Sequence, residues 1–261
     1  MSPQKRGLFT WTMVLVTLAF FYLPLLLLTF FSFNHSKSMV WEGASFRWYA
    51  ALFLHSPDLW ASFGKSIMIA LSASLVATLI GSLGAIGLYW YAFKSKRVIT
   101  VLTLLPLLLP EIIMGVSFLI FFSKIGLPLG LFSIFIAHTT FCIPYVFLIM
   151  TARLDEFDYS VIEAAYDLGA QEWVVLTNVI LPICRPAIMA SLLMSATLSL
   201  EDFVITFFVA GPGSTTLPLY IYSMIRFGVS PVINALSVVL IVGTAIIAVL
   251  TSRLFKYVIQ K

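Results

Sequence analysis

The chain has 261 residues, of which 61% are hydrophobic and 10% are charged, and its mean hydropathy is +1.06. A soluble domain needs roughly a quarter of its residues charged. This composition therefore excludes a soluble enzyme or a soluble binding module. The net charge of +4 is what a membrane protein gains from its basic cytoplasmic loops, so it does not indicate nucleic-acid binding.

Six mostly apolar runs predict transmembrane helices, because about 20 residues at 1.5 Å each cross the hydrocarbon core. They lie at 8–33, 64–92, 99–123, 130–151, 186–210 and 233–254. The first run follows Lys5 and Arg6, but it is too long for a signal peptide and no small-residue cleavage site follows it. We expect an all-α membrane protein of six transmembrane helices, forming a single permease domain over 1–261.

The distribution of lysine and arginine predicts that both termini lie in the cytoplasm, where membrane proteins carry an excess of basic residues. With the N-terminus inside, inner segments carry ten of these residues and outer segments carry five. The same orientation places the loop 153–185 in the cytoplasm. On this topology Cys142 and Cys184 are not expected to form a disulfide.

The loop contains Glu163-Ala164-Ala165-Tyr166-Asp167-Leu168-Gly169, and Val179-Ile180-Leu181-Pro182 follows after nine residues. This spacing resembles the EAA loop of bacterial ABC importer permeases, EAA-x3-G-x9-I-x-LP, with Val179 where isoleucine is usual. The resemblance implies the fold of type I ABC importer permeases (MetI-like), and a short coupling helix that docks into a cytoplasmic ATPase. The coupling residues that it implies are Glu163, Ala164, Ala165, Asp167, Gly169, Leu181 and Pro182.

Within this loop, Ser160 and Glu163 fit a capping box, with Ser160 as the N-cap. Gly169 is expected to end the helix in the left-handed conformation. A second short helix is expected from about Gln171 to Asn178, before prolines start the fifth span. An ordinary amphipathic loop, in which Glu163 only caps its own helix, is the plain alternative, and the two roles are compatible.

The chain has no ATP-binding motif of its own. Gly64-Lys65-Ser66 matches the end of a P-loop, but Leu59 stands at the position of the required first glycine. We therefore expect a transport subunit that is not an enzyme and holds no cofactor or metal, with ATP and Mg bound by a partner ATPase.

Three acidic residues, Glu111, Glu201 and Asp202, lie within predicted spans. An Asp at a helix centre costs about 2.5–3.5 kcal/mol on insertion scales, and such residues normally mark a substrate route. At 1.5 Å per residue they lie roughly 18–23 Å from the inner ends of their spans, which predicts an acidic layer suited to a cation. The resemblance adds Ser199 and Trp48 to this predicted pathway.

Other readings of these acids remain open. Glu111 follows Pro110 and would suit the start of a resumed helix. Glu201 and Asp202 would pair with a basic residue near the outer mouth, either Lys65, Lys124 or Arg226. His138 is expected to be a satisfied packing histidine and not a metal ligand, because no partner stands at metal-ligand spacing.

Helix packing leaves one further question. The second predicted span carries Ala73, Ala77, Gly81 and Ala85 at four-residue spacing, which places small side chains on one helix face. Such a face lets another backbone approach closely. It would pack either within this chain or against a second permease subunit.

Beyond the EAA loop, the chain is most similar to the spermidine/putrescine branch of these permeases. The similar stretches are 47–49 (RWY), 109–112 (LPEI), 153–158 (RLDEFD), 198–202 (LSLED), 210–212 (AGP), 217–224 (LPLYIYSM), 228–231 (GVSP) and 234–236 (NAL). The resemblance implies a bacterial inner-membrane complex with a second, PotB-like permease, two PotA-like cytoplasmic ATPases and a PotD-like extracytoplasmic binding protein.

Two alternatives to polyamine import remain. One is an ABC permease for another small solute, such as iron or a phosphonate. The other is a proton-coupled secondary transporter with the three intramembrane acids as its relay, although the EAA loop has no role there and no inverted repeat is evident.

Overall fold

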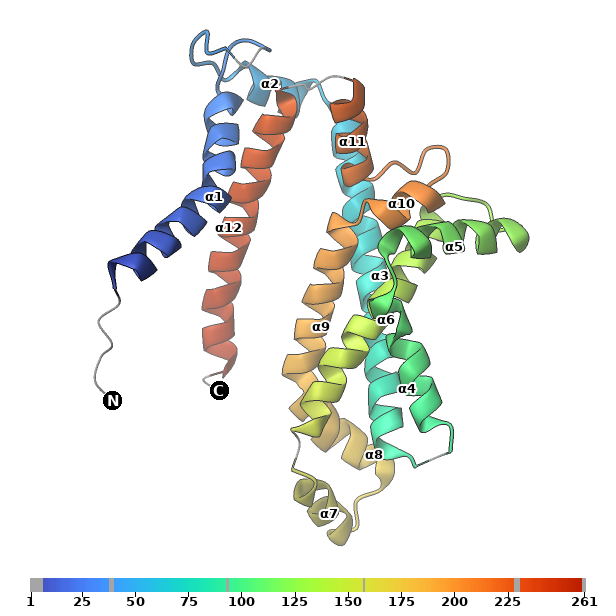
Figure 1. Cartoon of the computed structure of the whole chain (residues 1–261). Coiled ribbons are helices and arrows are strands. Elements are labelled where there is room, and N and C mark those ends of the chain that lie inside the picture. The colour runs from blue at the N-terminus through green and yellow to red at the C-terminus, as the bar shows by residue number, and fades with distance from the viewer. Residues whose placement is uncertain (1–6, 38–39, 93, 157, 228–230, 260–261) are drawn as a thin grey trace. The chain divides into compact units, whose positions relative to one another are not determined.

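The computed structural model describes residues 7–37, 40–92, 94–156, 158–227 and 231–259 (Figure 1). Within them every regular element is a helix, apart from one isolated bridge between Asn34 and Ala44. Some residues used in the sequence analysis lie outside the described residues. They are Lys5, Arg6 and Lys261, which count toward the predicted orientation, and Phe157 and 228–230, which belong to the similar stretches. The chain divides into two compact units: Met1–Asp58 with Ile221–Lys261 (unit 1), and Leu59–Tyr220 (unit 2).

Unit 1 contains α1 (Leu8–Ser32), α2 (Arg47–Leu54) and α12 (Val232–Ile259), and α12 packs against the other two. The most apolar window of α1 has no buried residue, as expected for a helix that faces lipid. The loop after α1 is organised by Asn34, whose side chain bonds the carbonyl of Val40 and the N–H of Glu42.

Unit 2 begins with α3 (Pro57–Trp90), α4 (Lys96–Leu104), the 3₁₀ helix η1 (Leu105–Leu108) and α5 (Glu111–Lys124). It continues with α6 (Leu131–Asp155), α7 (Ser160–Asp167), α8 (Glu172–Val175), the π-helix η2 (Leu176–Ile180), α9 (Leu181–Glu201) and α10 (Val204–Val209). The last helix, α11 (Leu217–Phe227), runs across the boundary between the units. In unit 2, α6 packs along α9, and α10 packs on both α5 and α6.

The small-residue face of α3 packs within this chain at Gly81. A Cβ added there would lie 2.7 Å from the Cβ of Val146 in α6, so only glycine fits this helix contact. Ala73, Ala77 and Ala85 on the same face are also buried. The structure therefore gives this face an intramolecular partner along part of its length.

Among the described residues, four helices are long and apolar enough to cross a membrane: Phe9–Ser32, Pro57–Trp90, Leu131–Asp155 and Glu172–Glu201. A fifth crossing results if the bent pair Lys96–Leu108 and Glu111–Lys124 counts as one span. The described apolar part of α12, Val232–Ile246, is shorter. The number six, like the single permease domain over 1–261, stays a prediction.

Pro106 and Pro110 predict that the third span, 99–123, is a broken helix, and the structure confirms this, because the chain bends by 111° between Leu108 and Glu111. A residue before proline is pushed out of the helical region, and Leu109 accordingly takes an extended conformation before Pro110. Glu111 then becomes the first residue of α5, which confirms the alternative that it starts a resumed helix. The common depth predicted for the three acids assumed a continuous rise along each helix. The bend before Glu111 means that this assumption does not hold for the third span.

The predicted break between the second loop helix and the fifth span is also wrong. Helices α8, η2 and α9 join into one helix over Glu172–Glu201. Pro182 has no N–H to donate, and its ring crowds the carbonyl four residues earlier. The chain widens into the π-helix Leu176–Ile180 directly before it instead of ending, and such bulges often occur at functional sites.

Candidate coupling elbow and buried polar cluster

The elbow comprises residues 158–180, which form α7, the turn after it, α8 and η2. Figure 1 shows α7 and α8 at one end of unit 2, with α10 at the other. Helix α7 starts at Ser160, but the predicted capping box is wrong, because the N-cap position belongs to Tyr159 and no side chain caps it. Asp158 accepts the N–H of Ser160 at 3.0 Å through its carboxylate. Hydrogen bonding from Ser160 to the ionised carboxylate lowers the pKa of Asp158.

The turn at Gly169 has the predicted left-handed backbone, with φ at +81°. The N–H of Gly169 donates to the carbonyl of Tyr166 at 2.8 Å, and the N–H of Ala170 donates to the carbonyl of Ala165 at 3.1 Å. This pair of bonds is the Schellman motif, which satisfies the last carbonyls of a helix. A Cβ at Gly169 would meet no atom within 4 Å, so the backbone conformation alone makes glycine favourable here.

The predicted coupling residues divide by exposure. Glu163, Ala164, Asp167, Gly169 and Pro182 are exposed. The remaining two, Ala165 and Leu181, are half-buried and pack against the hydrophobic core.

The elbow also exposes large apolar side chains at positions that the motif leaves unspecified. Leu168 is 89% exposed and Trp173 is 71% exposed. Clustered exposed apolar groups mark sites of protein or membrane interaction. Both residues flank the turn at Gly169. Their exposure indicates a contact surface on the elbow that the sequence motif does not specify.

Aromatic rings join the elbow to the end of α3. Trp90 lies edge-to-face with Tyr166 of α7, with ring centroids 6.5 Å apart, and Tyr89 lies 6.4 Å from Tyr159. Ile162 of α7 is 3% exposed and anchors the helix in the core. The elbow is therefore attached to unit 2 on one face and open on the other.

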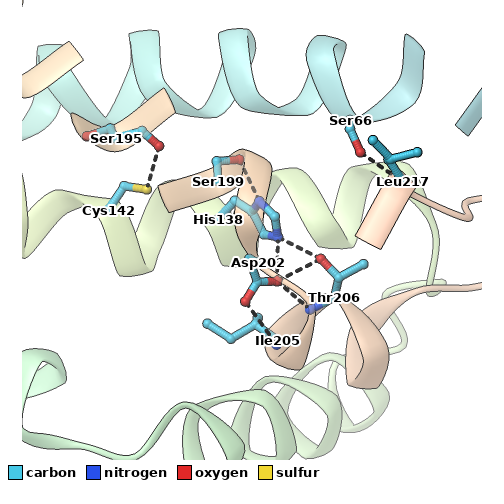
Figure 2. Close-up of polar contacts among 9 residues, drawn as sticks. All are labelled: Ser66, His138, Cys142, Ser195, Ser199, Asp202, Ile205, Thr206 and Leu217. Carbon is cyan, nitrogen blue, oxygen red and sulfur yellow. Dashed lines mark hydrogen bonds and ion pairs between the residues drawn. The ribbon is translucent and has the colours of Figure 1, made fainter. Parts of the chain in front are cut away.

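The second candidate site is a buried polar cluster of His138, Ser199, Asp202 and Thr206, which joins α6 to the break between α9 and α10 (Figure 2). The Nδ1 of His138 lies 2.7 Å from Ser199 Oγ. Its Nε2 lies 3.1 Å from a carboxylate oxygen of Asp202 and 2.9 Å from Thr206 Oγ1. His138 is 1% exposed and Asp202 is 8% exposed.

Asp202 also caps the start of α10. Its Oδ1 accepts the N–H of Ile205 at 3.2 Å, and its Oδ2 accepts the N–H and the hydroxyl of Thr206, each at 2.8 Å. These bonds satisfy helix N–H groups that have no partner inside the helix. The carboxylate therefore has protein donors on both oxygens.

The predicted pairing of Asp202 with Lys65, Lys124 or Arg226 is wrong, because the partner in the structure is His138. Lys65 instead donates to the carbonyl of Gly213 at 2.8 Å. His138 is satisfied as expected, and its partners include the carboxylate of Asp202, 64 residues away in the sequence. Within the described residues, no three His, Cys, Asp or Glu side chains gather as a metal site would require.

The other predicted pathway residues are placed differently. Glu111 and Glu201 are exposed, at the first position of α5 and the last of α9. Trp48 belongs to unit 1, where its buried indole donates to the carbonyl of Asn34 at 2.7 Å. The structure thus brings Ser199 and Asp202 to the same histidine, His138, while the role of all five predicted residues in a pathway stays a prediction.

Comparison with known proteins agrees with this helical arrangement. Residues 77–261 match the model of the family described as "Binding-protein-dependent transport system inner membrane component". The chain is 39% identical over 237 residues to the spermidine/putrescine transport system permease protein PotC of Escherichia coli (strain K12), covering 90% of this chain and 89% of that protein. It is also 39% identical over 253 residues to the putrescine transport system permease protein PotI of the same strain, covering 94% and 90%.

A solved bacterial ABC transporter involved in the import of the acidic polysaccharide alginate shares the fold. Its matching chain has a TM-score of 0.77 and 16% sequence identity, with 97% of this chain and 98% of that one covered. At that identity the likeness concerns architecture alone. The chain belongs to the family of binding-protein-dependent transport system inner membrane components, and it is homologous to the PotC and PotI permeases.

Proposed function

We propose that this chain is a permease subunit of an ATP-driven importer that carries polyamines across the bacterial inner membrane. The identity of 39% with permeases of spermidine/putrescine and putrescine systems over at least nine-tenths of the chain carries this proposal. The complex would add a second permease, two cytoplasmic ATPases that bind ATP and Mg, and an extracytoplasmic binding protein. The basic residues favour both termini and the elbow on the cytoplasmic side.

The elbow supplies the coupling step of the proposed mechanism. Its exposed surface at Ala164 and Leu168 offers small and apolar groups to an ATPase. Beyond the turn, the single helix Glu172–Glu201 has 30 residues, or roughly 45 Å at 1.5 Å per residue. Movement of the elbow when the ATPases close is therefore carried by one helix to the break at Asp202.

Two of the three acids are available to a solute. The carboxylate of Asp202 already has protein donors, whereas Glu111 and Glu201 are exposed. A polyamine carries several ammonium groups along a flexible chain, so two separated carboxylates suit it better than one. Glu111 and Glu201 are thus the proposed solute contacts, and Asp202 holds the helix break.

Glu111→Gln and Glu201→Gln are each expected to lower polyamine uptake roughly fivefold, since a partly exposed ion pair contributes up to about 1 kcal/mol. Uptake is measured in vesicles that contain the complete complex and saturating binding protein, with a panel of amines as competitors. Glu156→Gln, which removes an exposed carboxylate paired with Arg153, serves as the matched control. If both variants transport at the parent rate, Glu111 and Glu201 do not contact the solute. If no amine competes for uptake, the solute is not a polyamine.

A further inference from the structure

A pocket of about 470 Å³ lies between the end of α3 and the elbow. Its lining includes Ile86, Gly87 and Trp90 from α3, and Glu172 and Trp173 from α8. Pockets that hold small molecules have volumes of about 300–1,000 Å³. The space is therefore large enough for a ligand. Its described lining does not include Glu111, Glu201 or the buried polar cluster.

The lining favours a positive charge. Trp90, Tyr91 and Trp173 supply aromatic side chains, whose ring faces attract a cation. Of the described residues that line the pocket, Glu172 is the charged one, and the hydroxyl of Tyr91 donates to its Oε2 at 3.5 Å. None of the described lining residues is basic, so the described lining favours a cation over an anion.

The apolar part of the lining sets the shape of the ligand. Ile86 is 6% exposed, and Leu176 of η2 is half-buried beside it in the same lining. Contact between such a surface and a hydrocarbon chain is favourable, because it removes apolar area of both from water. A ligand with one charged end and an apolar stem satisfies both parts of the pocket.

We propose that this pocket binds a primary ammonium group carried on an apolar stem, with the ammonium at Glu172 and the aromatic rings around it. Two sources share this chemistry, a free aliphatic amine and the headgroup of an ethanolamine lipid. The ligand would touch α3 and α8 together, and Trp90 of the same lining also contacts Tyr166 of α7. Its binding is therefore linked to the position of the elbow.

Hexylamine is the probe, and tryptophan fluorescence of the complete complex in phosphatidylglycerol nanodiscs is the measurement. Gly87→Leu is expected to fill the pocket without a clash of its Cβ, which would meet no atom within 4 Å. Gly84→Leu is the matched control, since its Cβ is equally unobstructed and Gly84 is not part of the lining. Glu172→Gln removes the charge at nearly constant shape.

The expected result is a saturable hexylamine signal in the parent and in Gly84→Leu, with a half-saturation concentration at least tenfold higher in both Gly87→Leu and Glu172→Gln. Hexan-1-ol should bind at least tenfold more weakly than hexylamine in the parent. An unchanged half-saturation in Glu172→Gln, or equal binding of the alcohol, would overturn the proposal. Glu172→Gln tests the proposal even if Gly87→Leu fails to assemble.

A second arm separates the two sources. The titration is repeated in two sets of nanodiscs that hold the same fraction of phosphatidylglycerol, with phosphatidylcholine or phosphatidylethanolamine as the remaining lipid, so that the surface charge is constant. A higher half-saturation concentration in the phosphatidylethanolamine set shows that the lipid headgroup competes, and it assigns the site to lipid. An unchanged value assigns the site to a free amine. Because hexylamine is tested for binding and not for transport, the result is independent of whether the transported solute is a polyamine.

Discussion

Asp202→Asn is expected to destabilise the complex by about 3 kcal/mol and to abolish most uptake, because buried donors that now bond the carboxylate would lose their acceptor. The amide would also place N–H donors against the N–H of Thr206 or Ile205, which now donate to the carboxylate. The measurements are the thermal unfolding midpoint of the purified complex and uptake into vesicles.

Glu201→Gln is the matched control for this prediction, since it removes a neighbouring but exposed carboxylate. It should keep the parent unfolding midpoint while it lowers uptake. His138→Ala should lower the unfolding midpoint as Asp202→Asn does, because it removes the imidazole that contacts the Asp202 carboxylate. If Asp202→Asn loses uptake but keeps the parent midpoint, Asp202 contacts the solute instead of holding the break between α9 and α10.

Gly169→Val is expected to abolish coupling, with ATPase association weakened at least tenfold while the permease still inserts. The left-handed backbone at Gly169 costs an ordinary residue roughly 1–2 kcal/mol and a β-branched one more. The elbow would relieve this strain by changing the turn between α7 and α8. Binding of the ATPase and substrate-stimulated ATP hydrolysis are both measured.

Two further variants isolate the backbone as the cause. Gly169→Asn should retain more coupling than Gly169→Val, since asparagine tolerates the left-handed region. Gly84→Val has no neighbouring atom within 4 Å of its Cβ and no positive φ, so it should couple as the parent does. Normal substrate-stimulated hydrolysis in Gly169→Val would remove the elbow from the coupling step.

Local sequence signals predicted the elbow well, because its turn depends on neighbouring residues. Gly169 is the residue that a left-handed turn favours, and the spacing around it fixed the end of α7. The cap was harder, since Asp158 and Ser160 are both good acceptors near the helix start and the sequence does not show which one reaches a free N–H. The same applies to Pro182, because proline can end a helix or widen it.

Long-range contacts account for the rest. His138 and Asp202 are separated by 64 residues, and no periodicity in either helix signals that they meet. The prolines at 106 and 110 predicted a break in the third span, but the bend of 111° depends on how α5 packs against α10. The sequence therefore indicated which acids are unusual, and the structure was needed to separate the buried Asp202 from the exposed Glu111 and Glu201.

The most direct test of the proposed function is uptake of labelled spermidine by vesicles that contain the complete complex, with ATP held constant and a proton uncoupler added. Uptake is expected to require ATP and the binding protein, to persist with the uncoupler, and to disappear in Gly169→Val. Uptake that stops with the uncoupler while ATP is unchanged would contradict an ATP-driven permease and would favour a proton-coupled transporter.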